Sequence, residues 1–277
     1  MGAIEAAVKV ATEFGVQVKE PVSLRSTNNT VVWLRPAMIV AKVGVGHHRR
    51  LANELGVALE LTGLGGPAPA PASEIPQLVH RCDGFEITFW RYYPQPPGGA
   101  TISSRQLARA LRRLHASLGA ISPGMRARLP SFLEELGAVR VLLTDASRLE
   151  LLSEDDRLLL LHAFDRLAAE LQTTVRSGVQ RVIHGSPHRR NVLLADGEPR
   201  FIDFETVCVG PIEWDLAHLG KEVALDYGEA LNRPLERACR DMASVKTAAW
   251  CWRGANRGDL RDHAEFHLAQ VRRRFAG

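Results

Sequence analysis

One stretch, residues 181–205, constrains the fold more than any other part of the chain. It reads RVIHGSPHRRNVLLADGEPRFIDFE and holds an Asp-Gly pair between two apolar runs. Asp-Gly in this setting is a strong signal for a β-hairpin. The hairpin places Asn191 just before its first strand and Asp203 near the end of its second, so antiparallel pairing returns both side chains to the same end. Because Mg²⁺ takes oxygen ligands and shares them with phosphate, this end of the hairpin predicts a magnesium site with Asn191 and Asp203 as ligands.

The same stretch carries a spaced motif, His184-Gly185-x-x-His188-x-x-Asn191 followed by Ile202-Asp203-Phe204. This pattern resembles the catalytic core of the aminoglycoside phosphotransferase and choline kinase-like family, whose members are relatives of the protein kinases. The resemblance implies an α+β, protein kinase-like fold with two lobes. The N-lobe would hold an antiparallel β-sheet and a helix, and the C-lobe would be mainly helical. The implied reaction moves the γ-phosphate of ATP, with GTP not excluded, to a hydroxyl of a small molecule, either aminoglycoside-like or a metabolite, with Mg²⁺ as the metal.

Ser186 departs from the family pattern, which usually has aspartate after the His-Gly pair. That aspartate accepts or orients the proton of the substrate hydroxyl, whereas serine is no base at neutral pH without an activating partner. The resemblance assigns the catalytic loop to Ser186, in the position of the usual aspartate, together with His184 and His188. His184 would support the loop. His188 and Glu205 are the candidates for a replacement base, with loop packing as the competing interpretation of His188.

Three functions remain open on these residues. The first is an active phosphotransferase, and the second is a nucleotide-binding pseudokinase whose catalysis is impaired by Ser186. The third is an unrelated α/β protein in which the motif is a coincidence.

A lysine and a glutamate upstream of the motif fit the nucleotide and metal site that Asn191 and Asp203 predict. Lys42 lies in an apolar strand-like run, residues 38–43, and Glu54 lies in a helical pattern, residues 51–61. The simple interpretation of Lys42 is a strand-end lysine that extends to water. The interpretation from the resemblance is a lysine that is held by Glu54 and contacts the α- and β-phosphates.

The order of the remaining N-terminal elements predicts the sheet of the N-lobe. The turn at residues 26–29 stands where such kinases cover the phosphates, so Asn28 becomes a candidate phosphate contact. The adenine site is expected at Phe89 to Tyr93 through backbone groups, which names Phe89, Arg91 and Tyr92. A Pro/Gly-rich break then suggests an N-lobe of residues 1–95 and a C-lobe of residues 96–277. The pattern predicts a helix at 4–14 and strands at 22–24, 30–34, 38–43, 76–81 and 86–93.

The rest of the chain is predicted to be helical apart from the hairpin. Ser103, Ser131 and Ser153 each precede a helical pattern by the spacing of an N-cap, and the longest helix is expected at residues 154–177. Asp215, in a Gly-Pro-x-x-x-Asp-Leu-Ala segment, matches the family residue that holds the backbone of the catalytic loop. An acid favoured at a helix N-terminus is the alternative for that position.

Composition narrows the partners. The net charge is +4 and the sequence pI is about 9.1, but the basic residues form no stripe, so no nucleic acid partner is expected. No apolar run reaches about 18 residues, so no membrane partner is expected. The four cysteines form no C-x-x-C pair, and without a secretory signal they indicate reduced thiols in a cytoplasmic protein. Residues 204–277 hold eleven acidic and eleven basic residues, so charge leaves the substrate open. The oligomeric state also stays open.

Overall fold

The computed structural model of the protein describes residues 1–26, 29–46, 48–96, 101–228, 231–256 and 258–276. By its internal contacts the chain divides into two compact units. Unit 1 comprises Met1–Leu129 and Ser186–Val207, and unit 2 comprises Pro130–Gly185 and Cys208–Gly277. These units do not correspond to the predicted N-lobe and C-lobe, and the boundary between residues 95 and 96 stays a prediction.

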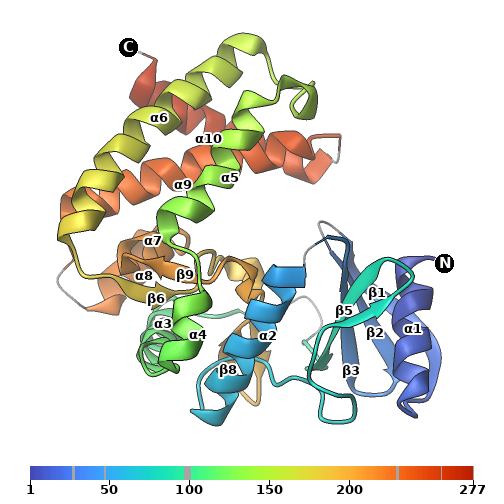
Figure 1. Ribbon diagram of the computed structural model, residues 1–277. Coiled ribbons are helices and arrows are strands. Elements are labelled where there is room, and N and C mark those ends of the chain that lie inside the picture. Colours follow the sequence, from blue (N-terminus) through green and yellow to red (C-terminus); the bar gives the residue numbers. More distant parts are fainter. Residues whose placement is uncertain (27–28, 47, 97–100, 229–230, 257, 277) are drawn as a thin grey trace. The chain divides into compact units, whose positions relative to one another are not determined.

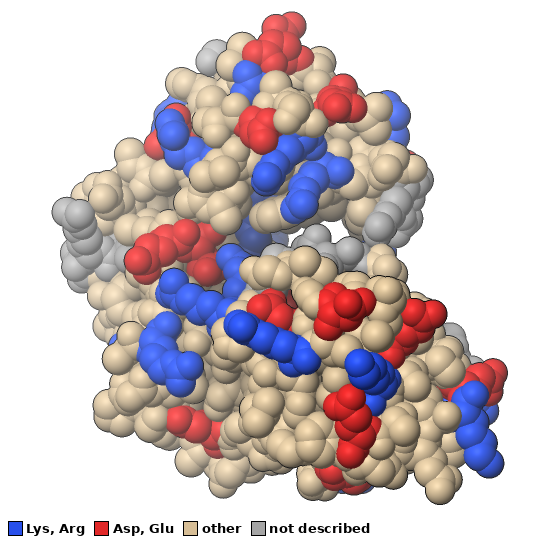
Figure 2. Space-filling view, turned by 45° about the vertical axis from the view of Figure 1, so that its right-hand side comes forward, with Lys and Arg blue, Asp and Glu red and all other residues tan. Residues whose placement is uncertain are grey.

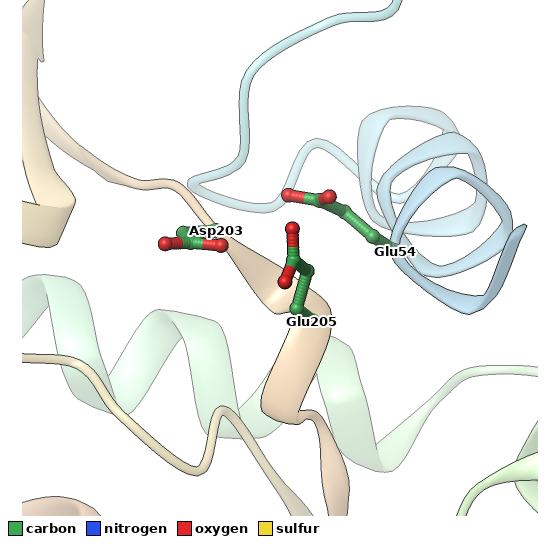
Figure 3. Close-up of side chains that lie close together, drawn as sticks. All are labelled: Glu54, Asp203 and Glu205. Atoms are coloured by element: carbon green, nitrogen blue, oxygen red, sulfur yellow. The ribbon is translucent and has the colours of Figure 1, made fainter. Parts of the chain in front are cut away.

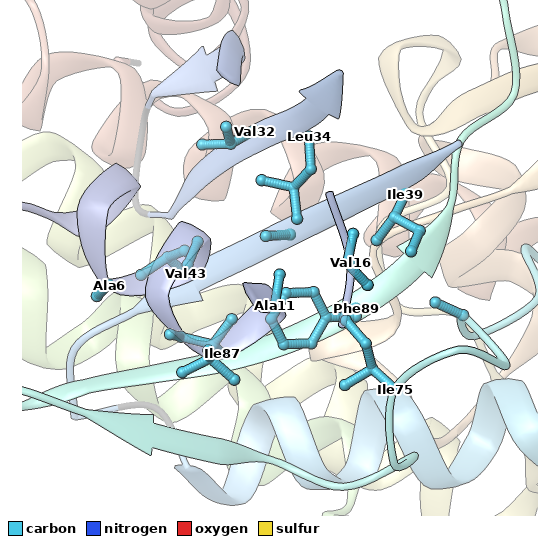
Figure 4. Packing of buried hydrophobic residues seen from close by; sticks show 14 residues of the cluster. Ala6, Ala11, Val16, Val32, Leu34, Ile39, Val43, Ile75, Ile87 and Phe89 are labelled. Atoms are coloured by element: carbon cyan, nitrogen blue, oxygen red, sulfur yellow. The ribbon is translucent and has the colours of Figure 1, made fainter. Parts of the chain in front are cut away.

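Unit 1 is built on a five-stranded antiparallel sheet with the strand order β1-β2-β3-β5-β4 (Figure 1). The N-terminal helix α1 packs on one face, where aliphatic side chains of the sheet form a buried core with its alanines and valine (Figure 4). The strands are β1 (Val18–Ser26), β2 (Thr30–Pro36), β3 (Ile39–Gly44), β4 (His80–Cys82) and β5 (Phe85–Arg91), and the first two helices are α1 (Ala3–Glu13) and α2 (His48–Gly63).

Two strands of the sheet, β1 and β4, differ most from the sequence prediction. β1 is longer than the predicted 22–24 because it pairs with β2 from Val18 to Ser26. β4 is shorter than the predicted 76–81 because its first half is a turn, in which the N–H of Leu78 donates to the carbonyl of Pro76 at 2.8 Å. The ring of His80 also contacts that carbonyl, with Nε2 at 2.9 Å.

Unit 1 also contains the predicted hairpin and two helices. Asp196 and Gly197 have φ values of +54° and +79° and form the two-residue turn between the strands. These left-handed values match a type I′ turn, which Asp-Gly favours. The second strand is shorter than expected, so Asp203 lies beyond it. The elements are α3 (Ser104–Gly119), α4 (Pro123–Arg128), the 3₁₀ turn η2 (Arg189–Asn191), β7 (Val192–Ala195), β8 (Glu198–Phe201) and the 3₁₀ turn η3 (Phe204–Thr206).

Unit 2 is mainly helical and holds one two-stranded antiparallel ladder between β6 and β9. Helices α6, α9 and α10 pack against one another along their lengths (Figure 1). The elements are α5 (Phe132–Thr144), η1 (Ala146–Arg148), α6 (Glu154–Ser177), β6 (Arg181–Ile183), β9 (Cys208–Gly210), α7 (Ile212–Ala217), α8 (Lys221–Tyr227), α9 (Arg233–Arg253) and α10 (Gly258–Phe275).

The three predicted serine N-caps are present. The side-chain oxygens of Ser103, Ser131 and Ser153 each accept a hydrogen bond from the backbone N–H three residues later, at 3.2 to 3.3 Å. Each satisfies one of the donors that a helix start leaves open. These local signals therefore predicted where three helices begin.

Acidic and basic side chains are interspersed over the face of the molecule shown in Figure 2. None of the helices in the described ranges is both long and apolar enough to cross a membrane.

Candidate active site

Lys42 reaches the site because side chains alternate along a strand. Ile39, Ala41 and Val43 of β3 face the core under α1, so Lys42 faces the other side of the sheet. Helix α2 packs on that side, where its Leu55 and Ala58 meet Trp90 and Val40. Glu54 precedes Leu55 in the same helix and is 3% exposed. The pairing expected from the sequence is present, with Lys42 Nζ 2.8 Å from Glu54 Oε2.

Three carboxylates surround the Lys42 ammonium. Besides Glu54, the oxygens Asp203 Oδ1 and Glu205 Oε1 lie 2.8 and 2.6 Å from Nζ. The three carboxylates converge from α2 and from the segment after the hairpin (Figure 3). The backbone N–H of Phe204 donates to Glu54 Oε1 at 3.2 Å, so both oxygens of this buried carboxylate accept hydrogen bonds. The side chain of Lys42 thus ties the sheet, α2 and the hairpin of unit 1 together.

Burial and charge act in opposite directions on this pair. Burial by itself would lower the pKa of Lys42, but the carboxylates of Glu54, Asp203 and Glu205 raise it above its ordinary value, so the ammonium stays charged. Burial, with the charges of Asp203 and Glu205, raises the pKa of Glu54 to about 8, and the Lys42 charge opposes that rise only in part. Without Lys42 the pKa of Glu54 would be higher still.

Asn191 and Asp203, the predicted metal ligands, both lie near the guanidinium of Arg25. Asn191 is 2% exposed, and its Nδ2 donates to the carbonyl of Ser186 at 3.1 Å. Its amide oxygen, Oδ1, therefore points the other way, where Nη1 of Arg25 lies at 3.4 Å. The same Nη1 lies 3.9 Å from Asp203 Oδ2. Asp203 has a left-handed backbone, φ +69° and ψ +59°, which aspartate tolerates better than most residues.

The donor set fits Mg²⁺. An amide oxygen and a carboxylate oxygen are suitable ligands for this ion. The positively charged guanidinium of Arg25 faces both oxygens, so a cation already lies beside them. Asp203 contacts two cations with separate oxygens, because Oδ1 meets Lys42 while Oδ2 faces Arg25. The acidic group formed by Glu54, Asp203 and Glu205 has ligand atoms within 4.8 Å of one another. We assign its centre to the ammonium of Lys42, which contacts all three.

The first part of the catalytic loop belongs to unit 2. The N–H groups of His184 and Gly185 donate to the two carboxylate oxygens of Asp215 at 2.9 and 2.8 Å. His184 and Asp215 are fully buried. The carbonyl of Gly185 accepts from Trp214 Nε1 at 2.8 Å. Asp215 thus holds the loop backbone, as the family resemblance implied, and the position in the first turn of α7 is compatible with the alternative.

From Ser186 onward the loop belongs to unit 1. Ser186 and His188 are half-buried, and His188 immediately precedes η2. Glu205, the other candidate base, is already engaged, since its Oε1 also accepts from Asn29 Nδ2 at 2.5 Å. This contact with Asn29 and that with Lys42 favour a structural role for Glu205 over a free general base.

The predicted adenine segment has its backbone groups in use. The N–H groups of Arg91 and Tyr92 donate to the carbonyls of Ala70 and Met38 at 2.9 and 2.8 Å, and the carbonyl of Phe89 accepts from Ala72 at 3.0 Å. Phe89 packs in the core of unit 1, Arg91 is exposed, and the ring of Tyr92 stacks on Trp33. Adenine contacts at these three residues stay a prediction. The backbone groups that already have protein partners are not available to bind adenine. Asn28 lies outside the described residues.

Sequence reasoning missed Arg25 as a member of the site, and it named the turn at residues 26–29 without singling out Asn29. Arg25 lies near the end of β1 and Asn29 in the turn that follows, and both contact residues more than 160 positions away. The sequence places that turn near the phosphates only through the family resemblance. No local pattern indicates which of its side chains reach back to the hairpin.

Comparison with known proteins gives the same fold. No curated protein matches the chain. A solved complex of APH(2")-IIia with GDP and kanamycin shares 17% identity, with a TM-score of 0.68 over 98% of this chain and 99% of that one. The amicoumacin kinase hAmiN, solved with AMP-PNP, Ca²⁺ and Ami, has a TM-score of 0.72 at 12% identity, over 93% and 89% of the two chains.

A choline/ethanolamine kinase family protein from Mesorhizobium loti has a TM-score of 0.65 at 19% identity, over 97% of this chain and 92% of that one. These likenesses confirm the α+β, protein kinase-like fold that the motif implied. The profile of the phosphotransferase enzyme family, APH, matches residues 23–248, which span both units. On the strength of that match, which covers most of its length, the chain belongs to the phosphotransferase enzyme family.

Proposed function

We propose that the protein transfers the γ-phosphate of ATP or GTP to a hydroxyl group of a small molecule. The observation that carries the proposal is the position of Lys42, which is held by Glu54 and faces Asp203. Phosphoryl transfer needs a cation for the phosphates and a place for the metal, and little covalent chemistry from the protein. Solved proteins of the same fold carry GDP or AMP-PNP with their small-molecule ligands, which supports a nucleotide as donor.

Each residue of the site has a role in this proposal. Lys42 contacts the α- and β-phosphates, and Glu54 keeps its ammonium in place. Asn191 and Asp203 supply oxygen ligands for Mg²⁺, which when bound neutralises charge on the phosphates. Asp215 holds the backbone at His184 and Gly185.

Ser186 is compatible with slow transfer. The transition state of phosphoryl transfer is loose in most analyses, and positioning and charge supply most of the catalysis. A general base contributes typically 10²–10⁴-fold, so its absence lowers the rate by about that factor without removing the other contributions. The acceptor that we propose is a small hydroxyl compound, aminoglycoside-like or a metabolite.

A second candidate follows from the same serine. If no group takes the proton, the chain binds Mg²⁺-nucleotide without useful transfer and acts as a pseudokinase. Ser186 is the one observation that favours this candidate over the first.

One experiment tests the proposal with a matched pair of variants. Asp203→Asn removes the negative charge of the metal ligand, and Asp196→Asn removes an equal charge from the turn of the hairpin, at a residue with a similar left-handed backbone and a 79% exposed side chain. Thermal unfolding with Mg²⁺-ATP and Mg²⁺-GTP measures binding, because a ligand of the native state raises the melting temperature. Phosphate transfer to a panel of hydroxyl compounds, followed by ³¹P NMR, measures activity.

We expect nucleotide stabilisation in the wild type and in Asp196→Asn, and its loss in Asp203→Asn. Transfer in the wild type supports the enzyme, whereas binding without transfer to any acceptor supports the pseudokinase. If neither nucleotide stabilises the wild type, both candidates are wrong.

A further inference from the structure

Arg25 reaches the metal-ligand residues from the far end of the sequence. It lies near the end of β1, where the pairing with β2 shifts register between Ser23 and Arg25. Such bulges re-aim a side chain and occur often beside active sites. Here the result is a contact across 166 residues, in which Nη1 of Arg25 meets Asn191 Oδ1 at 3.4 Å.

The contact is made by a single nitrogen. Nη1 is 3.4 Å from Asn191 Oδ1 and 3.9 Å from Asp203 Oδ2, which are the two oxygens assigned to Mg²⁺. Both distances are longer than those of good hydrogen bonds, so the contact is mainly an attraction between the guanidinium charge and the two oxygens. The guanidinium therefore stands as a cation in the place where the metal is proposed to bind.

The charge of the cluster explains why a second cation is held there. Three carboxyl groups, from Glu54, Asp203 and Glu205, surround one ammonium, so the cluster without Arg25 carries an excess of negative charge. Arg25 reduces that excess. A long side chain that is 41% exposed can leave without disturbing the core, because its alternative position is water.

Arg25 and a metal cannot use both oxygens together. Mg²⁺ binds its ligands at about 2.0–2.1 Å in near-octahedral geometry, and a guanidinium nitrogen that faces both oxygens, at 3.4 and 3.9 Å, obstructs an ion that uses the two together. The arginine must move before the ion can bind. Phosphate oxygens give it a new partner once it has moved, since the planar guanidinium binds phosphate with two parallel hydrogen bonds.

We propose that Arg25 is a built-in counter-ion that competes with free divalent metal for Asn191 and Asp203 and moves to the phosphates when metal and nucleotide arrive together. The inference rests on the proposed function, because it takes the metal ligands from there. It makes metal binding weak without nucleotide and strong with it. Arg25 is a positioning residue in this proposal: it contacts the two metal ligands before the metal binds, and it contacts the phosphates afterwards.

The test measures binding of Mn²⁺ alone by isothermal titration calorimetry and by the decrease of the free Mn²⁺ EPR signal. Arg25→Met keeps an unbranched side chain and removes the charge. Arg81→Met removes an equal charge from β4, the strand at the opposite edge of the same sheet, where Arg81 is 70% exposed. Arg25→Met/Asp203→Asn shows whether any gain depends on the metal site.

We expect Arg25→Met to bind Mn²⁺ about tenfold more tightly than the wild type, which corresponds to about 1.4 kcal/mol, with Arg81→Met within about twofold. The gain disappears in Arg25→Met/Asp203→Asn. With Mg²⁺-ATP the sign reverses, and Arg25→Met binds the complex about three- to tenfold more weakly, because a charge-assisted contact with the phosphates is lost. General damage to the fold would weaken both kinds of binding.

Unchanged or weaker Mn²⁺ binding in Arg25→Met overturns the inference, and so does a gain that survives Asp203→Asn. A gain equal to that of Arg81→Met also overturns it, because the effect is then one of net charge. If Mg²⁺-ATP stabilises the wild type but not Asp203→Asn while Arg25→Met leaves Mn²⁺ binding unchanged, the proposed function stands and the counter-ion alone is wrong.

Discussion

The ammonium of Lys42 lies 2.8 Å from a carboxylate oxygen of Asp203, although 161 residues separate the two along the chain. The same ammonium meets Glu54 of α2 at 2.8 Å. A strand, a helix and the segment after the hairpin therefore share one buried positive charge. The arrangement that we assign to phosphate binding also holds unit 1 together, so its variants must be read for stability as well as for activity.

Lys42→Met should be strongly destabilising. Glu54 has a 4% exposed side chain and would lose its positive partner, and removing one member of a buried pair costs about 3–5 kcal/mol. Urea unfolding at neutral pH measures the loss, and Lys19→Met, at an exposed position of β1, is the control. Lys42→Met/Glu54→Gln should recover at least about 1.5 kcal/mol of that loss, because the amide is neutral without binding a proton, whereas a buried glutamate without Lys42 must take up a proton well above its ordinary pKa. No recovery would mean that Glu54 is not the group left unpaired.

Asp215→Asn should weaken the start of the catalytic loop. Both carboxylate oxygens accept backbone N–H groups, from His184 and Gly185, and an amide offers only one acceptor oxygen. One buried N–H is then left facing an NH₂ donor, at a cost of about 1–3 kcal/mol. The exposed Asp262 of α10 offers the control variant Asp262→Asn, which should unfold like the wild type in urea. Equal stability of Asp215→Asn and wild type would contradict the role given to this aspartate.

Local signals predicted much of this fold. The three serine caps, the Asp-Gly turn and the apolar run of β3 each depend on neighbours in sequence, and each is found. The partner of Lys42 was also predictable, because a helix with one buried glutamate follows the strand directly. The beginning of β4 was not, since a turn closed by the carbonyl of Pro76 replaces strand pairing there.

Contacts that cross the sequence were beyond such signals. Arg25 reaches Asn191 because of a register shift in β1, and the shift depends on pairing with β2 rather than on the residues themselves. The left-handed backbone of Asp203 ends the hairpin earlier than its apolar run suggests, and this turns the carboxylate toward two different cations. The motif placed Asp203 in the site but did not show that its two oxygens have separate partners.

The ion pair between Asp156 and Arg272 should give unit 2 a pH-dependent part of its stability. Burial by itself would raise the pKa of Asp156, but hydrogen bonds from Ser153 and Arg272 and the charge of Arg272 hold it below its ordinary value. A depressed folded-state pKa means stability that is present above the unfolded value of about 3.9 and lost as pH falls through the folded value. Asp156→Asn should therefore cost about 1 kcal/mol at pH 7, and this difference should shrink below about pH 4.

Urea unfolding between pH 3 and pH 7 measures this dependence. Asp155→Asn is the control, because Asp155 occupies the same first turn of α6 but is exposed. Both variants then lose the same favourable interaction between an acidic side chain and the helix N-terminus, so the difference between them reports the ion pair. A cost for Asp156→Asn that stays constant over the whole range would contradict the assignment to an ionised carboxylate.

Variants of Ser186 distinguish proton transfer from nucleotide binding, because Ser186 stands in the position of the usual catalytic aspartate and is not one of the residues assigned to metal or phosphate. If transfer proceeds without a base at this position, Ser186→Ala should change kcat by less than about threefold, because the hydroxyl takes no proton at neutral pH. Ser186→Asp should raise kcat by about tenfold or more, since a positioned base contributes typically 10²–10⁴-fold. Steady-state transfer to the best acceptor of the panel measures both, with nucleotide affinity as a check that binding is intact. Ser186→Asp/Asp203→Asn should lose the gain, because a base is of use only when the phosphates are positioned. A loss of more than about a hundredfold in Ser186→Ala would show that the serine itself handles the proton, and the weak-base argument would then be wrong.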